Sequence, residues 1–116
     1  MMKFSVLLNW QKNAKMIEIK NRFYKARRRA RSLLMACGYN VTFLSDGPFD
    51  VEASRRYEIR KIKICLDEIT ETDRKGIERT ELPALCRKEI WLKRMNISDF
   101  EIIDFPNDVN GKCLTT

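Results

Sequence analysis

One segment of the sequence combines an apolar helical repeat with a dense run of arginines, and it limits how the chain can fold. Apolar residues recur there in alternating steps of four and three. This spacing predicts a helix with one buried face, and Gly38 is suited to end it because glycine readily adopts the left-handed conformation. The rest of the chain must therefore supply an apolar surface for this helix. The repeat consists of Ile19, Phe23, Ala26, Ala30, Leu33, Leu34 and Cys37.

The same segment holds most of the excess positive charge. Residues 1–40 carry ten basic side chains and one acid, Glu18, whereas residues 41–116 have a net charge of −2 and the whole chain +7. This asymmetry indicates a polyanionic partner, and arginine matches the geometry of phosphate. A solvated helix face is the alternative. The residues predicted to contact nucleic acid here are Lys25, Arg27, Arg28, Arg29 and Arg31.

Alternating side chains predict five strands after this helix. They cover residues 39–43, 49–53, 59–66, 89–92 and 100–105, with a turn at 45–48 and a tight reversal at 54–57. Thr70, three positions before Asp73, predicts the start of a second helix that ends near Glu81 before Pro83.

The predicted order is helix, three strands, helix, two strands. A helical connection between strands favours a parallel pair, so the fold expected is α/β, a mixed β-sheet flanked by helices. Residues 1–105 form one domain in this interpretation, in which 1–18 are uncertain, Lys3–Leu8 being either strand or helix, and 106–116 form a loose tail.

The second and third strands read as a hairpin with Arg55 and Arg56 at its tip. In that register Asp50 lies opposite Lys61 and Glu52 opposite Ile59, and opposed side chains share a sheet face. One face is apolar and predicts core; the other is either a wet surface or a site. The apolar face collects Phe49, Val51, Ala53, Ile62, Ile64 and Leu66, and the polar face Asp50, Glu52, Lys61, Lys63 and Cys65.

Several functional classes are excluded by composition. The chain has no histidine, which removes Ser-His-Asp triads and Cys-His pairs. Its four cysteines form no CxxC pair, so a zinc site is not expected, and reduced thiols in the cytoplasm are. The apolar stretch Phe4–Leu8 is too short to span a membrane, so no membrane partner is expected.

Three parts of the chain resemble the core of the PD-(D/E)XK nucleases. They are Gly38-Tyr39 after the basic helix, the segment 45–51 and the segment 60–65, and the likeness extends over about residues 19–105. The sequence is similar to archaeal Holliday junction resolvases and related small phage or archaeal nucleases. The resemblance implies a restriction endonuclease-like core, Mg²⁺ held by carboxylates, nucleic acid as partner, DNA rather than RNA, and a homodimer.

The resemblance places Asp50 at the metal-binding aspartate, but the acid-x-lysine pair of the family falls on Lys63-Ile64-Cys65. A lysine in place of a carboxylate repels a metal cation, and Cys65 supplies no ammonium. The catalytic candidates are therefore Asp50, Glu52 and Lys63, with Asp67 as a substitute carboxylate.

Three hypotheses remain. The first is a nuclease-like protein that binds nucleic acid with an impaired metal site, using Arg55, Arg56 and Lys61 beside the basic helix. The second is an active Mg²⁺-dependent DNA endonuclease built on Asp50 with Glu52 or Asp67. The third is a basic protein-interaction module without nuclease ancestry.

Overall fold

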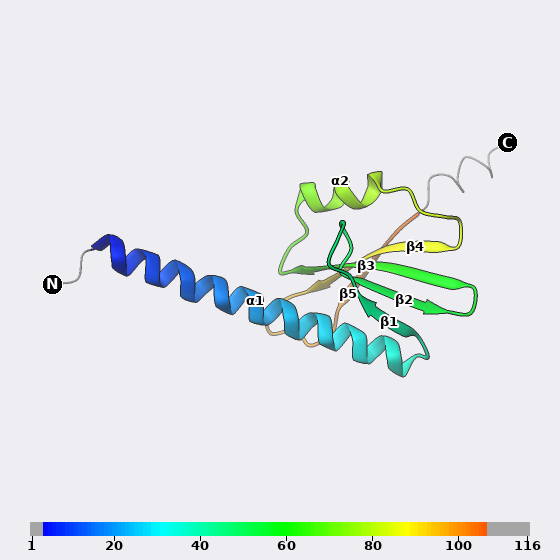
Figure 1. Ribbon diagram of the computed structural model, residues 1–116, viewed down its shortest axis with the longest axis horizontal. Coiled ribbons are helices and arrows are strands. Elements are labelled where there is room, and N and C mark those ends of the chain that lie inside the picture. Colours follow the sequence, from blue (N-terminus) through cyan, green and yellow to red (C-terminus); the bar gives the residue numbers. More distant parts are fainter. Residues whose placement is uncertain (1–3, 107–116) are drawn as a thin grey trace.

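The computed structural model describes residues 4–106, with side chains from residue 12 onward. The order of elements is the predicted one, helix, three strands, helix, two strands (Figure 1). Within this part of the chain, neither helix is long and apolar enough to cross a membrane. The elements are α1 (Phe4–Ala36), β1 (Asn40–Phe43), β2 (Val51–Arg55), β3 (Glu58–Leu66), α2 (Glu71–Arg79), β4 (Cys86–Lys93) and β5 (Glu101–Phe105).

Helix α1 is longer than the apolar repeat alone predicts. It begins at Phe4, so the ambiguous stretch Lys3–Leu8 is helical from Phe4 onward. It ends at Ala36, and Gly38 has a φ of 89°, which confirms the predicted stop. Residues 12–21 are all exposed, and this half of α1 extends past the sheet (Figure 1).

The five strands form one mixed sheet in the order β1-β2-β3-β4-β5. The pairs β1–β2, β2–β3 and β4–β5 are antiparallel, whereas β3 and β4 are parallel. Helix α2 connects the parallel strands β3 and β4, as the sequence predicts, because a crossover helix brings the chain back in the same direction. The helices cover opposite faces of the sheet (Figure 1), so the fold has three layers.

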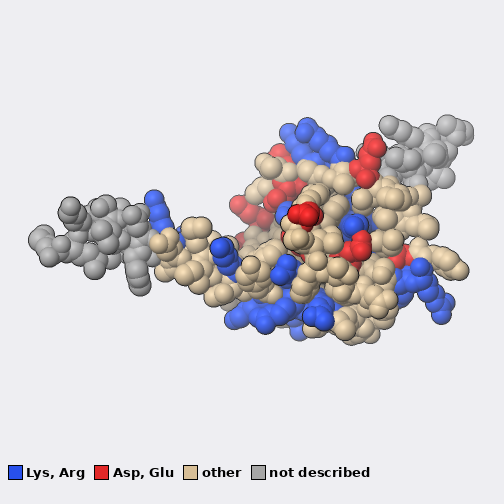
Figure 2. Space-filling model, viewed as in Figure 1, with Lys and Arg blue, Asp and Glu red and all other residues tan. Residues whose placement is uncertain are grey.

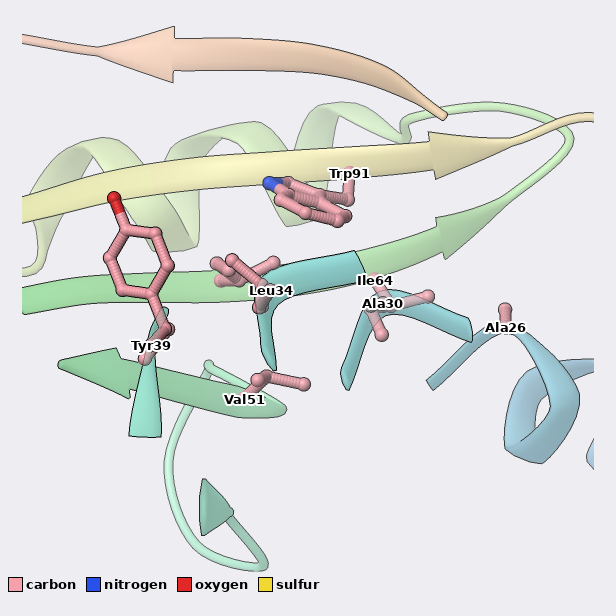
Figure 3. Packing of buried hydrophobic residues seen from close by; sticks show 9 residues of the cluster. Ala26, Ala30, Leu34, Tyr39, Val51, Ile64 and Trp91 are labelled. Atoms are coloured by element: carbon pink, nitrogen blue, oxygen red, sulfur yellow. The ribbon is translucent and has the colours of Figure 1, made fainter. Parts of the chain in front are cut away.

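The core between α1 and the sheet is built on small helix residues. Ala26, Ala30 and Leu34 are buried against strand residues of β2, β3 and β4 (Figure 3). Alanines let the helix approach the sheet closely, and Trp91, 3% exposed, fills the space beside them. The predicted repeat was therefore right for Ala26, Ala30 and Leu34. By contrast, Ile19, Leu33 and Cys37, predicted on the same buried face, are exposed.

The core between α2 and the sheet contains two residues that the sequence places differently. Phe49, predicted on the face of Val51, packs instead with Cys65 and Ile77. Strand β2 begins only at Val51, so the alternation does not extend to Phe49 and that prediction was wrong. Cys65 is 5% exposed, so the face of β3 predicted to be polar is buried near the C-terminal end of the strand.

The β2–β3 hairpin has a register two residues away from the predicted one. Glu52 lies opposite Lys61 and Val51 opposite Ile62, because the strands continue to Arg55 and resume at Glu58 with Arg56 and Tyr57 as the turn. Arg56 has a φ of 49°, a conformation for which asparagine or glycine is the usual signal. A shift by two leaves the side chains within β2 and β3 on their predicted faces.

Helix α2 has the predicted N-terminal cap. The Thr70 hydroxyl accepts the backbone N–H of Asp73 at 3.1 Å, and the Asp73 carboxylate accepts the N–H of Thr70. The helix ends at Arg79, two residues before the predicted Glu81. Lys88 of β4, 3% exposed, donates to the carbonyl oxygens of Glu78 and Thr80, where the helix dipole favours a cation.

Candidate nucleic-acid interface

The exposed side of α1 carries four basic side chains without acidic partners, here called the basic strip. Lys25, Arg28, Arg29 and Arg31 are exposed, and within the described side chains none of them forms an ion pair. No Asp or Glu occurs in residues 19–45. In Figure 2, Lys and Arg side chains lie along α1, whereas the Asp and Glu side chains visible in this view lie over the rest of the molecule. The four residues span the full width of the exposed side of α1, because Arg29 lines a hollow with Lys93, whereas Arg31 lies 5.7 Å from the Phe43 ring centroid of β1.

Two hollows flank the basic strip, and no carboxylate lines either of them within the described part of the chain. The Tyr24 hollow, about 450 Å³, lies between α1 and Phe43 of β1. The Arg29 hollow, about 270 Å³, lies between α1 and the chain that follows β4, where Lys93 adds a further cation. Both are therefore suited to anions.

Arg27, also predicted to contact nucleic acid, has a different environment. Its guanidinium lies 4.3 Å from the ring centroid of Phe43 and 5.2 Å from that of Tyr24. Its Nε is buried and has no hydrogen-bond partner. Cation–π contacts of this kind stabilise an arginine against aromatic rings, so Arg27 joins α1 to β1 rather than standing free in the strip.

Of the two arginines at the tip of the β2–β3 hairpin, Arg55 is held by contacts within the fold, as Arg27 is, whereas Arg56 is exposed. Arg55 donates to the Cys37 carbonyl oxygen at 2.9 Å, lies 4.4 Å from the Tyr39 ring centroid and pairs with Glu58 at 3.4 Å. It anchors the hairpin to the end of α1. Arg56 is exposed at the turn, so it is the hairpin arginine left for a partner.

The predicted catalytic residues lie together on the α2 side of the sheet, but each carboxylate faces an ammonium group. Lys63 Nζ is 3.8 Å from Asp50 Oδ2, and Lys61 Nζ is 2.6 Å from Glu52 Oε1. Asp50 Oδ2 also accepts the backbone N–H of Ile64 at 2.8 Å. The site is close to neutral, unlike the basic strip.

These residues do not form a set of ligands suited to a divalent cation. Mg²⁺ prefers oxygen ligands in octahedral geometry, and here the two lysines take the positions beside both carboxylates. Among the described side chains, no three of the types His, Cys, Asp and Glu gather to hold a metal. The geometry therefore supports charge neutralisation at this point of the sheet.

The substitute carboxylate Asp67 lies elsewhere. It accepts two hydrogen bonds of 2.9 Å from Arg22 of α1 and a third from the Met95 N–H, and the hydrogen bond from Arg22 lowers the pKa of Asp67. Asp67, with a φ of 67°, ties α1 to the loop after β4. It joins neither Asp50 nor Glu52.

A third hollow, about 460 Å³, lies between α1, the end of β3 and the start of α2. Lys20 and Lys63 line it together with Glu68 and Asp73, so its charges balance. Burial and the nearby Asp73 carboxylate raise the pKa of the Cys65 thiol to about 11. The thiol is therefore protonated at neutral pH and is no nucleophile.

A buried polar network, which the sequence does not reveal, lies on the α1 side. Glu89, 1% exposed, accepts hydrogen bonds from Arg60 and from the Trp91 indole at 2.9 Å. Burial alone would raise the pKa of Glu58, but hydrogen bonds from Tyr39 and Arg87 lower it. Arg87 also pairs with Glu89 at 3.8 Å, so Glu58 belongs to the same network.

Comparisons with known proteins give no matching family model, no matching curated protein and no matching solved structure.

Proposed function

We propose that the chain binds nucleic acid through the basic strip of α1 and that its nuclease-like centre is impaired. The observation that carries the proposal is the set of four exposed cations, Lys25, Arg28, Arg29 and Arg31, which have no acidic partner among the described residues. Cations paired inside a fold contribute little to binding, whereas unpaired ones replace the counterions of a polyanion. Arginine also forms paired hydrogen bonds with phosphate.

The nuclease-like ancestry is supported by the order of elements and by the place of Asp50. The order α-β-β-β-α-β-β is the one the resemblance implies, and Asp50 directly precedes β2. Lys63 lies beside Asp50 where the resemblance would place a second carboxylate. We infer that Lys63 neutralises Asp50, so that binding remains and metal-dependent cleavage is lost. The resemblance also implies a homodimer, which sedimentation of the free protein measures.

The binding test compares two triple variants of equal charge change. Arg28→Gln/Arg29→Gln/Arg31→Gln removes three cations of the basic strip, whereas Arg74→Gln/Lys75→Gln/Arg79→Gln removes three exposed cations from α2 on the opposite face. Fluorescence anisotropy with labelled DNA should show weaker binding of every sequence by the first variant, since phosphate contacts carry no sequence information. The second variant should bind as the unchanged chain does. Equal binding by all three proteins contradicts the proposal.

A second assay addresses cleavage. Branched and linear DNA are incubated with the protein and Mg²⁺ or Mn²⁺, with Asp50→Ala as the control. We expect no cleavage. Cleavage that Asp50→Ala abolishes would favour the active endonuclease instead, and failure to bind any nucleic acid would favour a protein-interaction module.

A further inference from the structure

The Tyr24 hollow is the one of the three described hollows that combines cations with an aromatic ring and has no carboxylate in its lining; Tyr24 also lines the third hollow, but there beside Glu68 and Asp73. The Tyr24 hollow is lined by Asn21, Tyr24, Lys25, Arg27, Arg28 and Phe43. Tyr24 is 47% exposed, which is not unusual for tyrosine, a residue type intermediate between buried and exposed. Part of the Tyr24 ring is thus open to solvent beside three basic side chains.

The ring of Tyr24 is held in place before any ligand arrives. Arg27 lies 5.2 Å from its centroid, and Phe23 meets it edge to face at 5.9 Å. Arg27 is itself fixed against Phe43 at 4.3 Å. A ring fixed in this way loses little conformational freedom on binding, which favours affinity.

The pairing of a ring with cations distinguishes between forms of nucleic acid. A duplex offers phosphates to the cations but keeps its bases stacked inside. An unpaired strand offers both, since its bases stack on aromatic side chains while a basic groove follows its backbone. The Arg29 hollow has cations without an aromatic ring, and the third hollow contains two acids.

We propose that the Tyr24 hollow binds one nucleotide of a single-stranded nucleic acid, with the base stacked on Tyr24 and the flanking phosphates on Lys25 and Arg28. This inference rests on the proposed function and specifies its ligand. The Asn21 amide, at the same hollow, supplies a donor and an acceptor for a base edge. The basic strip then continues along the backbone of the strand.

The test measures binding of an oligothymidylate of about 16 nucleotides and of a duplex of the same length. Tyr24→Ala should weaken single-strand binding by about 5- to 150-fold, the range for loss of one base–aromatic stack, and should leave duplex binding unchanged. Tyr24→Phe keeps the ring and should restore binding. Tyr57→Ala is the matched control, because Tyr57 is 85% exposed at the hairpin turn and lines none of the three hollows.

A second readout uses 5-iodouracil in the same oligonucleotide. Irradiation should cross-link the base to Tyr24, which peptide mass spectrometry identifies. Loss of affinity that is equal for Tyr24→Ala and Tyr57→Ala, or a duplex bound as tightly as the single strand, would overturn the inference. In either case a weakened triple arginine variant would leave the proposed function standing, whereas equal binding by that variant removes both.

Discussion

The salt dependence of binding is the most direct quantitative test of the basic strip. A strip that contacts phosphates through Lys25, Arg28, Arg29 and Arg31 displaces counterions from a single strand at four positions. The expected slope of log K against log salt is then about −2.8. Affinity should fall about 50-fold between about 50 mM and 200 mM KCl.

Removing half of these contacts should halve the slope. For Arg28→Gln/Arg31→Gln, two contacts remain, so the expected slope is about −1.4 and the fall over the same range about 7-fold. The control Arg74→Gln/Arg79→Gln lowers the net charge equally but on α2, and it should keep the slope of the unchanged chain. Fluorescence anisotropy titrations at four salt concentrations measure each slope.

Two results would refute the reasoning. A slope near zero for the unchanged chain would mean that phosphates are not contacted at all. A slope that falls equally in both double variants would mean that net charge governs binding, and that the strip on α1 has no special place in it.

The remaining predictions concern stability and reactivity. Glu89→Gln leaves the guanidinium of Arg60 buried without a carboxylate, and urea denaturation should show a loss of about 3–5 kcal/mol. Thr70→Ala removes the cap of α2 and should lower the free energy of unfolding by about 1 kcal/mol. Because the pKa of Cys65 is about 11 and Cys37 is exposed, alkylation at pH 8 followed by mass spectrometry should label Cys37 and spare Cys65.

Each of these predictions has its own control. Glu101→Gln breaks the exposed pair with Arg94 and should change stability by less than about 1 kcal/mol; a similar loss for Glu89→Gln would mean that its burial does not matter. Thr72→Ala, one position inside α2, removes a threonine without touching the cap. Alkylation of Cys65 as fast as that of Cys37 would contradict its raised pKa.

The sequence predicted the order of elements because each has a local signal. The apolar repeat and Gly38 mark α1, alternation marks the strands, and Thr70 marks α2. The turn of the hairpin has no such signal: Arg56 and Tyr57 stand where asparagine or glycine usually indicates the reversal, so the predicted register was wrong by two residues.

The sequence predicted the positive charge of the candidate site, but not which of its cations are bound by other residues of the fold. The run of arginines is visible in the sequence, but which of them stay free depends on neighbours distant along the chain. Arg27 lies against Phe43, and Arg22 binds Asp67, 45 residues away. The Arg60–Glu89 pair likewise depends on the parallel register of β3 with β4, which no short-range pattern specifies. Lys88 is likewise not free for a partner, because its ammonium group donates to carbonyl oxygens at the end of α2.

The overhang of α1 divides this helix into two parts with different thermodynamics. Residues 12–18 line none of the three hollows between α1 and the sheet and are all exposed, so their backbone hydrogen bonds should open without disturbing the core, and hydrogen exchange there should be fast. The turns that contain Ala26 and Ala30 are buried against the sheet, so we expect their amides to exchange slowly, through larger openings of the domain. The cations proposed to contact a ligand lie in the same turns as these buried alanines. We therefore expect the distances between the cations to stay fixed even when the preceding turns of α1 unfold locally.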